Sequence, residues 1–198
     1  MKRLAIAVAS WLVLSGALFA QKTLSVVGQD RFEADFPSGG HLRVHVRSGD
    51  LRIVGSDEAK ITVRFWGRSP SELHDLRVSL KTAGNNGELS IHGGPSNNLE
   101  IEIRVPRISN LFLRMPAGNA EIEGLLGDKD VELHAGDLRL EVGAPEQYAI
   151  ADASVLAGDI QTGPFGVSKD GLFRSFHTHG SGQYRLHAHV GAGDITFE

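Results

Sequence analysis

The stretch Gly136-Asp137-Leu138-Arg139-Leu140 decides the expected fold of this 198-residue chain. It joins a Gly-Asp turn to a short strand in which apolar Leu138 and Leu140 alternate with Arg139. The same start of Gly, Asp and an apolar residue recurs, with one weaker copy in which Asn replaces Asp. The other copies are Gly49-Asp50-Leu51, Gly118-Asn119-Ala120, Gly158-Asp159-Ile160 and Gly193-Asp194-Ile195. We therefore expect several short strands that begin at one kind of turn.

The spacing of these turns indicates stacked coils. Gly118, Gly136 and Gly158 are 18 and 22 residues apart, and the interval of 35 residues to Gly193 has room for two shorter coils or one coil with an insertion. A period of about 20 residues with short strands is typical of a β-solenoid, whose equivalent strands lie parallel and about 4.8 Å apart. The inward side chains should then form continuous apolar ladders, and those we expect inside are Leu138, Leu140, Ile150, Val155 and Ile160.

The first half of the chain also alternates with period two, as in His41–Arg47 and Ile61–Trp66. The sequence Gly84-Asn85-Asn86-Gly87 predicts a hairpin between Val78–Thr82 and Glu88–His92. We therefore predict one all-β domain over residues 21–198. Its strands should meander with antiparallel pairing over about residues 36–115 and form stacked coils over about residues 116–198.

Residues 1–20 have the order of a secretory signal peptide. Lys2 and Arg3 precede the apolar run Leu4–Leu14, and small residues follow, with cleavage expected after Ala20 or, alternatively, Ala17. The alternative is a retained N-terminal anchor, but the run is too short for a comfortable transmembrane helix, and no later segment is long and apolar enough for one. We expect export to the periplasm, the cell surface or the medium. The chain has no cysteine, which excludes disulfides, thiolate metal sites and a lipidated cysteine.

The charge makes nucleic acid an unfavourable partner. Removal of residues 1–20 takes away two basic residues and changes the net charge from −4 to −6. Phosphate binding needs clustered Lys and Arg, and the sequence has no dense basic patch.

Two stretches give the chain a family resemblance. Gly39-Gly40-His41-Leu42-Arg43-Val44 followed by Ser48-Gly49-Asp50-Leu51-Arg52-Ile53-Val54-Gly55 resembles the start of the bacterial putative-adhesin domains, formerly a domain of unknown function. Gly118–Gly124 and Gly136–Leu140 look like the repeated coils of those domains, and the resemblance covers most of residues 36–198. It implies a fold like a right-handed parallel β-helix and an exported location. It implies no enzymatic activity.

The repeated aspartates have two interpretations. Stacking could align Asp50, Asp137, Asp159 and Asp194 in a ladder of carboxylates that binds calcium. Asp after Gly is also a turn former whose side chain accepts backbone N–H groups, and this role needs no ligand. The nine-residue period of the calcium-binding solenoids is absent, so we favour the turn interpretation.

Four histidines near the C-terminus are candidate ligands for zinc or copper. His177 and His179 share one strand face, as do His187 and His189. If Gly180-Ser181-Gly182 closes a hairpin, His177 lies opposite Arg185, whereas in a solenoid the two pairs lie on separate strands. We expect no carboxylate or cysteine beside them to complete a site. We therefore favour exposed polar positions, and we predict neither a metal site nor a cofactor.

Catalysis has little support in the sequence. No Gly-x-Ser-x-Gly elbow is present, and no glycine-rich loop leads into a helix as phosphate-binding motifs require. We expect an exported, non-catalytic envelope or surface module whose partner is a protein or a glycan. The alternative is a carbohydrate-binding or carbohydrate-cleaving β-helix, which requires carboxylates beside an aromatic platform. The candidate platforms are Trp66, Tyr148 and Tyr184.

Overall fold

The computed structural model describes residues 22–95, 98–169 and 172–198, so the predicted signal peptide lies outside the described residues. In the described part, all regular structure is β-strand apart from three short 3-10 helices: η1 (Pro70–Leu73), η2 (Pro145–Gln147) and η3 (Gly163–Phe165). The chain is therefore all-β, as the alternation of apolar residues predicts. No helix among the described residues is long and apolar enough to cross a membrane.

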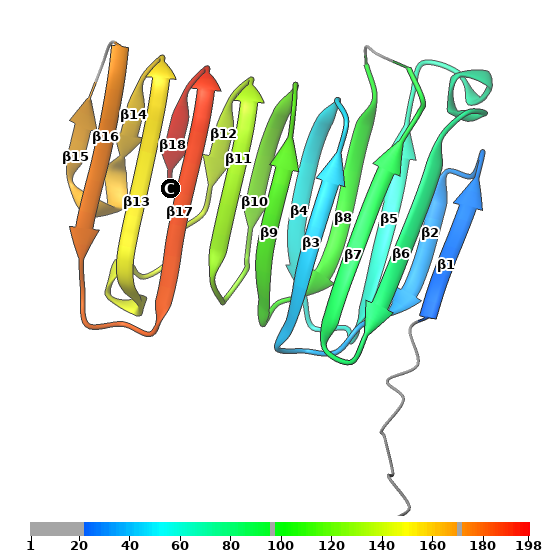
Figure 1. Ribbon diagram of the computed structural model, residues 1–198, viewed down its shortest axis with the longest axis horizontal. Helices are drawn as coiled ribbons and strands as arrows, with labels where there is room; N and C mark the ends of the chain where they lie inside the picture. Colours follow the sequence, from blue (N-terminus) through cyan, green and yellow to red (C-terminus); the bar gives the residue numbers. More distant parts are fainter. Residues whose placement is uncertain (1–21, 96–97, 170–171) are drawn as a thin grey trace, which may run out of the picture.

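The strands form two nine-stranded sheets that lie face to face (Figure 1). Sheet A runs in the order β1 (Lys22–Val27), β6 (Arg77–Ala83), β7 (Asn86–His92), β3 (Gly40–Val46), β9 (Ser109–Met115), β11 (Lys129–Ala135), β17 (Tyr184–Ala192), β13 (Tyr148–Ala157) and β16 (Leu172–His179). Sheet B runs in the order β15 (Val167–Lys169), β14 (Ile160–Thr162), β18 (Ile195–Phe197), β12 (Leu138–Leu140), β10 (Asn119–Glu123), β4 (Asp50–Ser56), β8 (Glu100–Pro106), β5 (Lys60–Trp66) and β2 (Arg31–Asp35).

Most of the stack consists of β-arches, in which two successive strands belong to opposite sheets. The arches are β3–β4, β7–β8, β9–β10, β11–β12, β13–β14 and β17–β18. Neighbouring arches pair parallel in both sheets. Antiparallel strands flank the stack at both ends: β1, β6, β2 and β5 at one end, and β15 and β16 at the other.

This pairing differs from the predicted division near residue 115. The predicted hairpin of β6 and β7 is confirmed, with Lys81 opposite Glu88. The N-terminal strands β3 and β4, however, pair parallel with their neighbours, while antiparallel pairing also occurs near the C-terminus. Alternation identifies the buried face of a strand but carries no information on the direction of its partner, which explains the error.

The spatial order of the arches is not their order in the chain. The arch β17–β18 lies between β11–β12 and β13–β14, so that in Figure 1 the red strand β17 separates yellow β13 from yellow-green β11. Likewise, β3–β4 lies between β7–β8 and β9–β10. The 35-residue interval before Gly193 contains the flanking strands β15 and β16, after which the chain returns into the stack.

One apolar core fills the space between the sheets. Of the residues expected inside, Leu138, Leu140, Val155 and Ile160 are buried, but Ile150 is half-exposed. The register of β13 against β17 shifts between Tyr148 and Ile150. A β-bulge of this kind adds one residue to a strand and so reverses the face of those that follow. As a result, Ala151 and Ala153 point inward.

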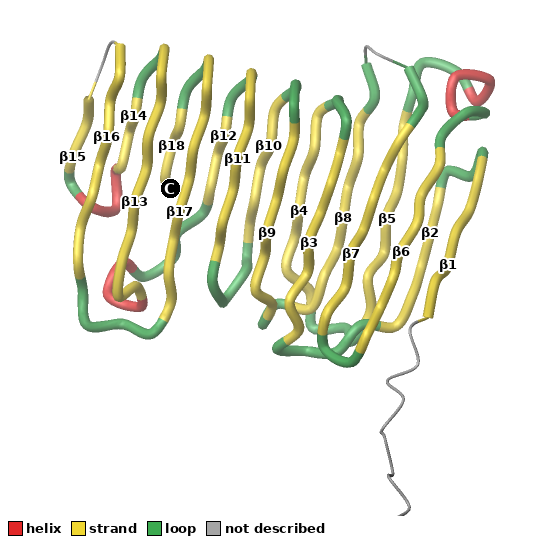
Figure 2. The backbone as a smooth tube through the Cα atoms, in the orientation of Figure 1, coloured by secondary structure: helices red, strands yellow, loops and turns green. Residues whose placement is uncertain are grey.

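The Gly-Asx turns stack along one edge of the sheets, where Figure 2 shows short green links between the two layers. Gly136 has φ +125°, a backbone conformation that side chains with a Cβ rarely adopt. A Cβ there would lie only 2.0 Å from the carbonyl oxygen of Gly118 in the neighbouring arch. Both the turn conformation and the close stacking therefore require glycine.

Candidate functional site

The outer face of sheet B carries a shallow groove of about 770 Å³ that crosses β5, β8, β4, β10, β12 and β18. Its side chains come from outward positions that alternate with the buried core residues. The polar and aromatic members of the groove lining are Asp50, Arg52, Trp66, Glu100, Glu102, Asn119, Glu121, Asp137, Arg139, Asp194 and Thr196.

Parallel stacking lines up charges of opposite sign across this groove. In register, Glu102 lies opposite Arg52, Arg52 opposite Glu121, and Glu121 opposite Arg139. The Arg52 guanidinium is 2.7 Å from Glu123 and 3.7 Å from Glu121, and the hydrogen bond to Glu123 raises the pKa of Arg52. Arg52 and Arg139, which both line the groove, are thus paired with Glu121 of the same lining, and all three side chains are in contact with solvent.

Trp66 forms an apolar wall of the groove. It follows buried Phe65 in β5 and points to the opposite face, with 45% of its surface exposed, as its position in the alternation predicts. Glu100 of β8 lies in register with Trp66 on one side and with Asp50 on the other. An exposed indole beside carboxylates offers both stacking and hydrogen bonding to a ligand.

The two tyrosines do not serve as surface platforms. Tyr148 is buried, its hydroxyl accepts a hydrogen bond from Lys129 Nζ at 2.7 Å, and it donates to the carbonyl of Val142 at 3.2 Å. Tyr184 is half-buried and packs edge-on against Tyr148 with ring centroids 6.4 Å apart. Of the three predicted platforms, Trp66 is the one that borders the groove.

The turn aspartates form a hydrogen-bonded ladder at the edge of the groove. Asn119 Oδ1 accepts a hydrogen bond from the backbone N–H of Asp137 at 3.0 Å. Asp137 Oδ1 accepts one from the backbone N–H of Asp194 at 2.9 Å, and Asp194 Oδ1 accepts one from the backbone N–H of Asp159 at 2.8 Å. The side chains thus accept backbone N–H groups, as the turn interpretation predicts, but each donor belongs to the neighbouring arch. One oxygen of Asp137 and one of Asp194 are therefore engaged by the backbone.

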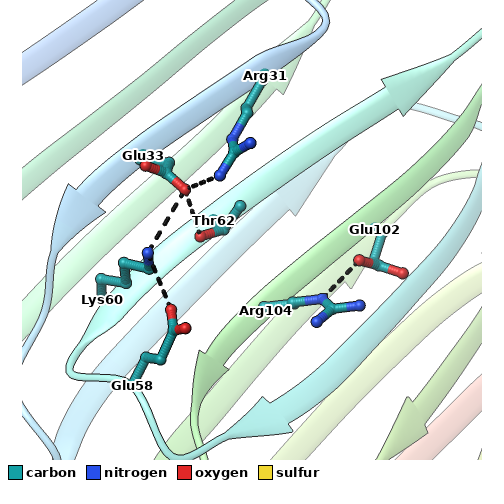
Figure 3. Close-up of polar contacts among 7 residues, drawn as sticks. All are labelled: Arg31, Glu33, Glu58, Lys60, Thr62, Glu102 and Arg104. Atoms are coloured by element: carbon teal, nitrogen blue, oxygen red, sulfur yellow. Dashed lines mark hydrogen bonds and ion pairs between the residues drawn. The ribbon is translucent and has the colours of Figure 1, made fainter.

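A second ion-pair network lies beyond Trp66, toward the β2 edge of sheet B. Figure 3 shows Lys60 between Glu58 and Glu33, with Lys60 Nζ 2.9 Å from Glu58 and 3.6 Å from Glu33. Arg31 also donates to Glu33, and this hydrogen bond lowers the pKa of the Glu33 carboxyl. On neighbouring β8, Arg104 Nε is 2.7 Å from Glu102. These charges, like Arg52, Glu121 and Arg139 in the groove, are paired with one another.

The four histidines lie on the outer face of sheet A. The hairpin alternative is wrong, because β13 separates β16 from β17 in the sheet, and the two pairs lie on separate strands, as in the solenoid alternative. His177 and His187 therefore both lie opposite Asp152 of β13, from its two sides. His187 also lies opposite Asp130, and its ring nitrogen, Asp130 and Glu132 form a cluster with ligand atoms within 4.8 Å. The expectation that no carboxylate lies beside the histidines is therefore wrong, because the proximity of these carboxylates depends on the order of the strands.

Comparison with known proteins supports the fold. No protein-family model matches the chain, and no curated protein matches it. The structure of a putative cell adhesion protein from Clostridium sporogenes is similar, with a TM-score of 0.51 and 14% identity over 90% of this chain and 99% of the other. A putative adhesin from Bacteroides fragilis matches with a TM-score of 0.37 and 10% identity over 91% of this chain and 99% of the other. At this identity, the first likeness extends to the all-β fold and no further.

Proposed function

We propose that the chain is an exported, non-catalytic binding module of the bacterial cell envelope that acts as an adhesin. The groove on sheet B, with exposed Trp66 at its wall, is the observation that carries the proposal. An exposed aromatic side chain on a rigid sheet supplies contact area at low entropic cost, and the surrounding ion pairs supply polar contacts. The ligand class is a protein or a glycan of the envelope.

The architecture in this proposal is a right-handed solenoid like a β-helix. Parallel pairing of the arches in both sheets and the stacked Gly-Asx turns support it. The similarity to the putative cell adhesion protein of Clostridium sporogenes supports an adhesin-like surface role. The order of residues 1–20, basic then apolar then small, supports export.

A second candidate is a carbohydrate-cleaving protein that uses the same groove. Glu100 lies in register with Trp66, and Glu102 belongs to the same lining, so acidic side chains flank an aromatic wall. Glycoside cleavage requires one carboxyl that acts as an acid and one that acts as a base or nucleophile. Glu102 is already engaged by Arg104, whose Nε is 2.7 Å away, so this carboxylate has a protein partner and is less available to a glycosidic oxygen.

Binding is tested by sedimentation of the protein with insoluble polysaccharide and protein fractions of a bacterial envelope. We expect Trp66→Ala to reduce the bound fraction at least tenfold. Phe173→Ala is the matched control, because Phe173 is an exposed aromatic on β16 of sheet A, and binding should be unchanged. Equal binding by both variants would contradict the proposed face.

Catalysis and export have separate readouts. Release of reducing sugar ends from envelope polysaccharide, lost in a Glu100→Gln variant, would overturn the non-catalytic proposal in favour of the second candidate. Expression in a bacterial host followed by fractionation and N-terminal sequencing tests export. We expect a periplasmic or external product that starts at Gln21; an uncleaved product confined to the cytoplasm would contradict export.

A further inference from the structure

Two histidines of β16 meet on the outer face of sheet A. Phe176 points into the core, so that His177 and His179 lie together on the opposite face. Their Nε2 atoms are 2.7 Å apart, and the ring centroids are 4.4 Å apart with the planes at 83°. The two Nε2 atoms are therefore hydrogen-bonded to each other above the edge strand of the sheet.

Asp152 fixes the orientation of His177. It lies directly opposite His177 in the neighbouring strand β13, and its Oδ1 accepts a hydrogen bond from Nδ1 of His177. A carboxylate on Nδ1 holds the proton there, so that Nε2 carries the lone pair. This arrangement is the one in which metal-bound imidazoles are usually held, because the carboxylate sets the tautomer and strengthens the ligand.

We propose that His177 and His179 bind a divalent transition-metal ion of the zinc or copper(II) class through their Nε2 atoms, with Asp152 as the positioning carboxylate. Two imidazole nitrogens bound tetrahedrally at about 2.05 Å from zinc lie about 3.3 Å apart, so the pair needs to open by roughly 0.6 Å. Both side chains are exposed, which allows this small rotation. With Nδ1 of His177 protonated, the proton between the two Nε2 atoms belongs to His179, and on metal binding it moves through solvent to Nδ1 of the same ring, so that both Nε2 atoms offer a lone pair. The remaining coordination positions face solvent and are available to water.

The surrounding charges favour a cation. Across the sheet, Asp152, His187 and Asp130 follow His177 in register, so that carboxylates alternate with imidazoles on neighbouring strands. Imidazole nitrogen and carboxylate oxygen are the ligands that zinc and copper(II) accept.

A competing position on the same face is the cluster of Asp130, Glu132 and His187. Arg114 already occupies it, with its guanidinium 3.0 Å from Asp130 and 2.8 Å from Glu132. This guanidinium is also stacked on Phe112, 3.6 Å from the ring centroid. An ion there has to compete with a fixed positive charge. By contrast, no guanidinium within the described part of the chain forms an ion pair or hydrogen bond with His177 or His179.

The test is isothermal titration of the protein, purified without a polyhistidine tag, with zinc chloride and with copper(II) chloride. We expect one ion per chain and an increase in melting temperature at saturation, because the ion binds the folded state. The double variant His177→Ala/His179→Ala should lose this binding at least tenfold. Asp152→Asn should weaken it by about 10- to 100-fold, as loss of an outer carboxylate usually does.

The second His-x-His pair is the matched control. His187 and His189 have the same spacing on the same face, but His189 Nδ1 is bound to Ser154 Oγ at 2.8 Å. We expect His187→Ala/His189→Ala to bind as the wild type does. Absence of binding by the wild type, undiminished binding by the His177/His179 variant, or loss of binding in the control alone would each overturn the proposal. The melting temperatures without metal should agree among these variants, which separates loss of the site from loss of the fold.

Discussion

Asp137 Oδ1 accepts a hydrogen bond from the backbone N–H of Asp194 at 2.9 Å, although 57 residues separate them in the chain. Asp194 in turn accepts the N–H of Asp159, and Asn119 accepts that of Asp137. The ladder therefore follows the spatial order of the arches, in which β17–β18 is inserted before β13–β14. Each Asx side chain satisfies a backbone donor of the next arch and helps to hold the two arches in register.

Removal of one acceptor from this ladder should destabilise the protein moderately. Asp137→Ala leaves the N–H of Asp194 without its partner, and we expect a loss of about 1–2 kcal/mol in the free energy of unfolding. Asp137→Asn keeps an Oδ1 in place, as Asn119 already does one arch away. Its stability in urea denaturation should lie within about 0.5 kcal/mol of the wild type. Equal losses in both variants would show that the charge, and not the acceptor, matters.

Gly136, which precedes Asp137 in the chain, should tolerate substitution far less than Asp137 does. In Gly136→Ala the new Cβ meets the carbonyl oxygen of Gly118 at 2.0 Å, in addition to the unfavourable φ of +125°. We expect a loss of more than 3 kcal/mol or failure to fold. Gly143→Ala separates the two causes, because Gly143 has φ +71° with nothing within 4 Å of the added Cβ. That variant should lose only about 1–2 kcal/mol by thermal or urea denaturation.

Lys129 is a buried cation in a row of apolar side chains across sheet A, and it should make the stability of the fold depend on pH. It lies in register with Leu111 and Leu186 and donates to Tyr148. Burial lowers the pKa of Lys129 from 10.5 to about 8. Below pH 8 both the folded and the unfolded chain bind this proton. Burial of the charged ammonium then lowers the free energy of unfolding by its full cost of about 3 kcal/mol.

Between pH 8 and pH 10.5 only the unfolded chain keeps the proton, so the stability of the wild type should rise with pH. From pH 7 to pH 9.5 we expect a gain of about 2 kcal/mol that Lys129→Met, already more stable at pH 7, does not show. Urea denaturation of both proteins at pH 7 and pH 9.5 measures this gain in the free energy of unfolding. Higher pH is avoided, because burial raises the pKa of Tyr148 to about 12 and its ionisation in the unfolded chain opposes folding. A parallel rise in both proteins would assign the effect to another group.

The sequence predicted the local structure well, because local structure depends on residue type. Alternating apolar residues identify the buried face, and Gly-Asp identifies a turn that only glycine can adopt, as Gly136 shows. A prediction of the buried face from alternation fails where a strand contains one extra residue. The bulge after Tyr148 turns Ile150 outward and buries Ala151 instead. Nothing in the side chains of this segment signals the extra residue.

The spatial order in which the arches stack was not predictable from the sequence. Leu138, Ile160 and Ile195 are all apolar and occupy equivalent places in their arches, so any order of stacking buries them. The surface depends on that order, since Asp152 reaches both His177 and His187 only because β13 lies between β16 and β17. The carboxylate partners of the histidines therefore emerge from the structure, whereas the exposure of Trp66 follows directly from alternation.

Adjacent residues of β5 provide a direct test of that exposure. Phe65 is 2% exposed and packs in the core, whereas Trp66 is 45% exposed and borders the groove. Phe65→Ala should cost about 3–5 kcal/mol in the free energy of unfolding, because it removes a buried ring and leaves a cavity. Trp66→Ala should cost less than about 1 kcal/mol, since the indole contributes little to the core. If Trp66→Ala destabilised the fold as much as Phe65→Ala does, the tryptophan would be a structural residue. A small effect on stability combined with loss of envelope binding assigns Trp66 to recognition, because a side chain that the fold does not need is then required by the ligand.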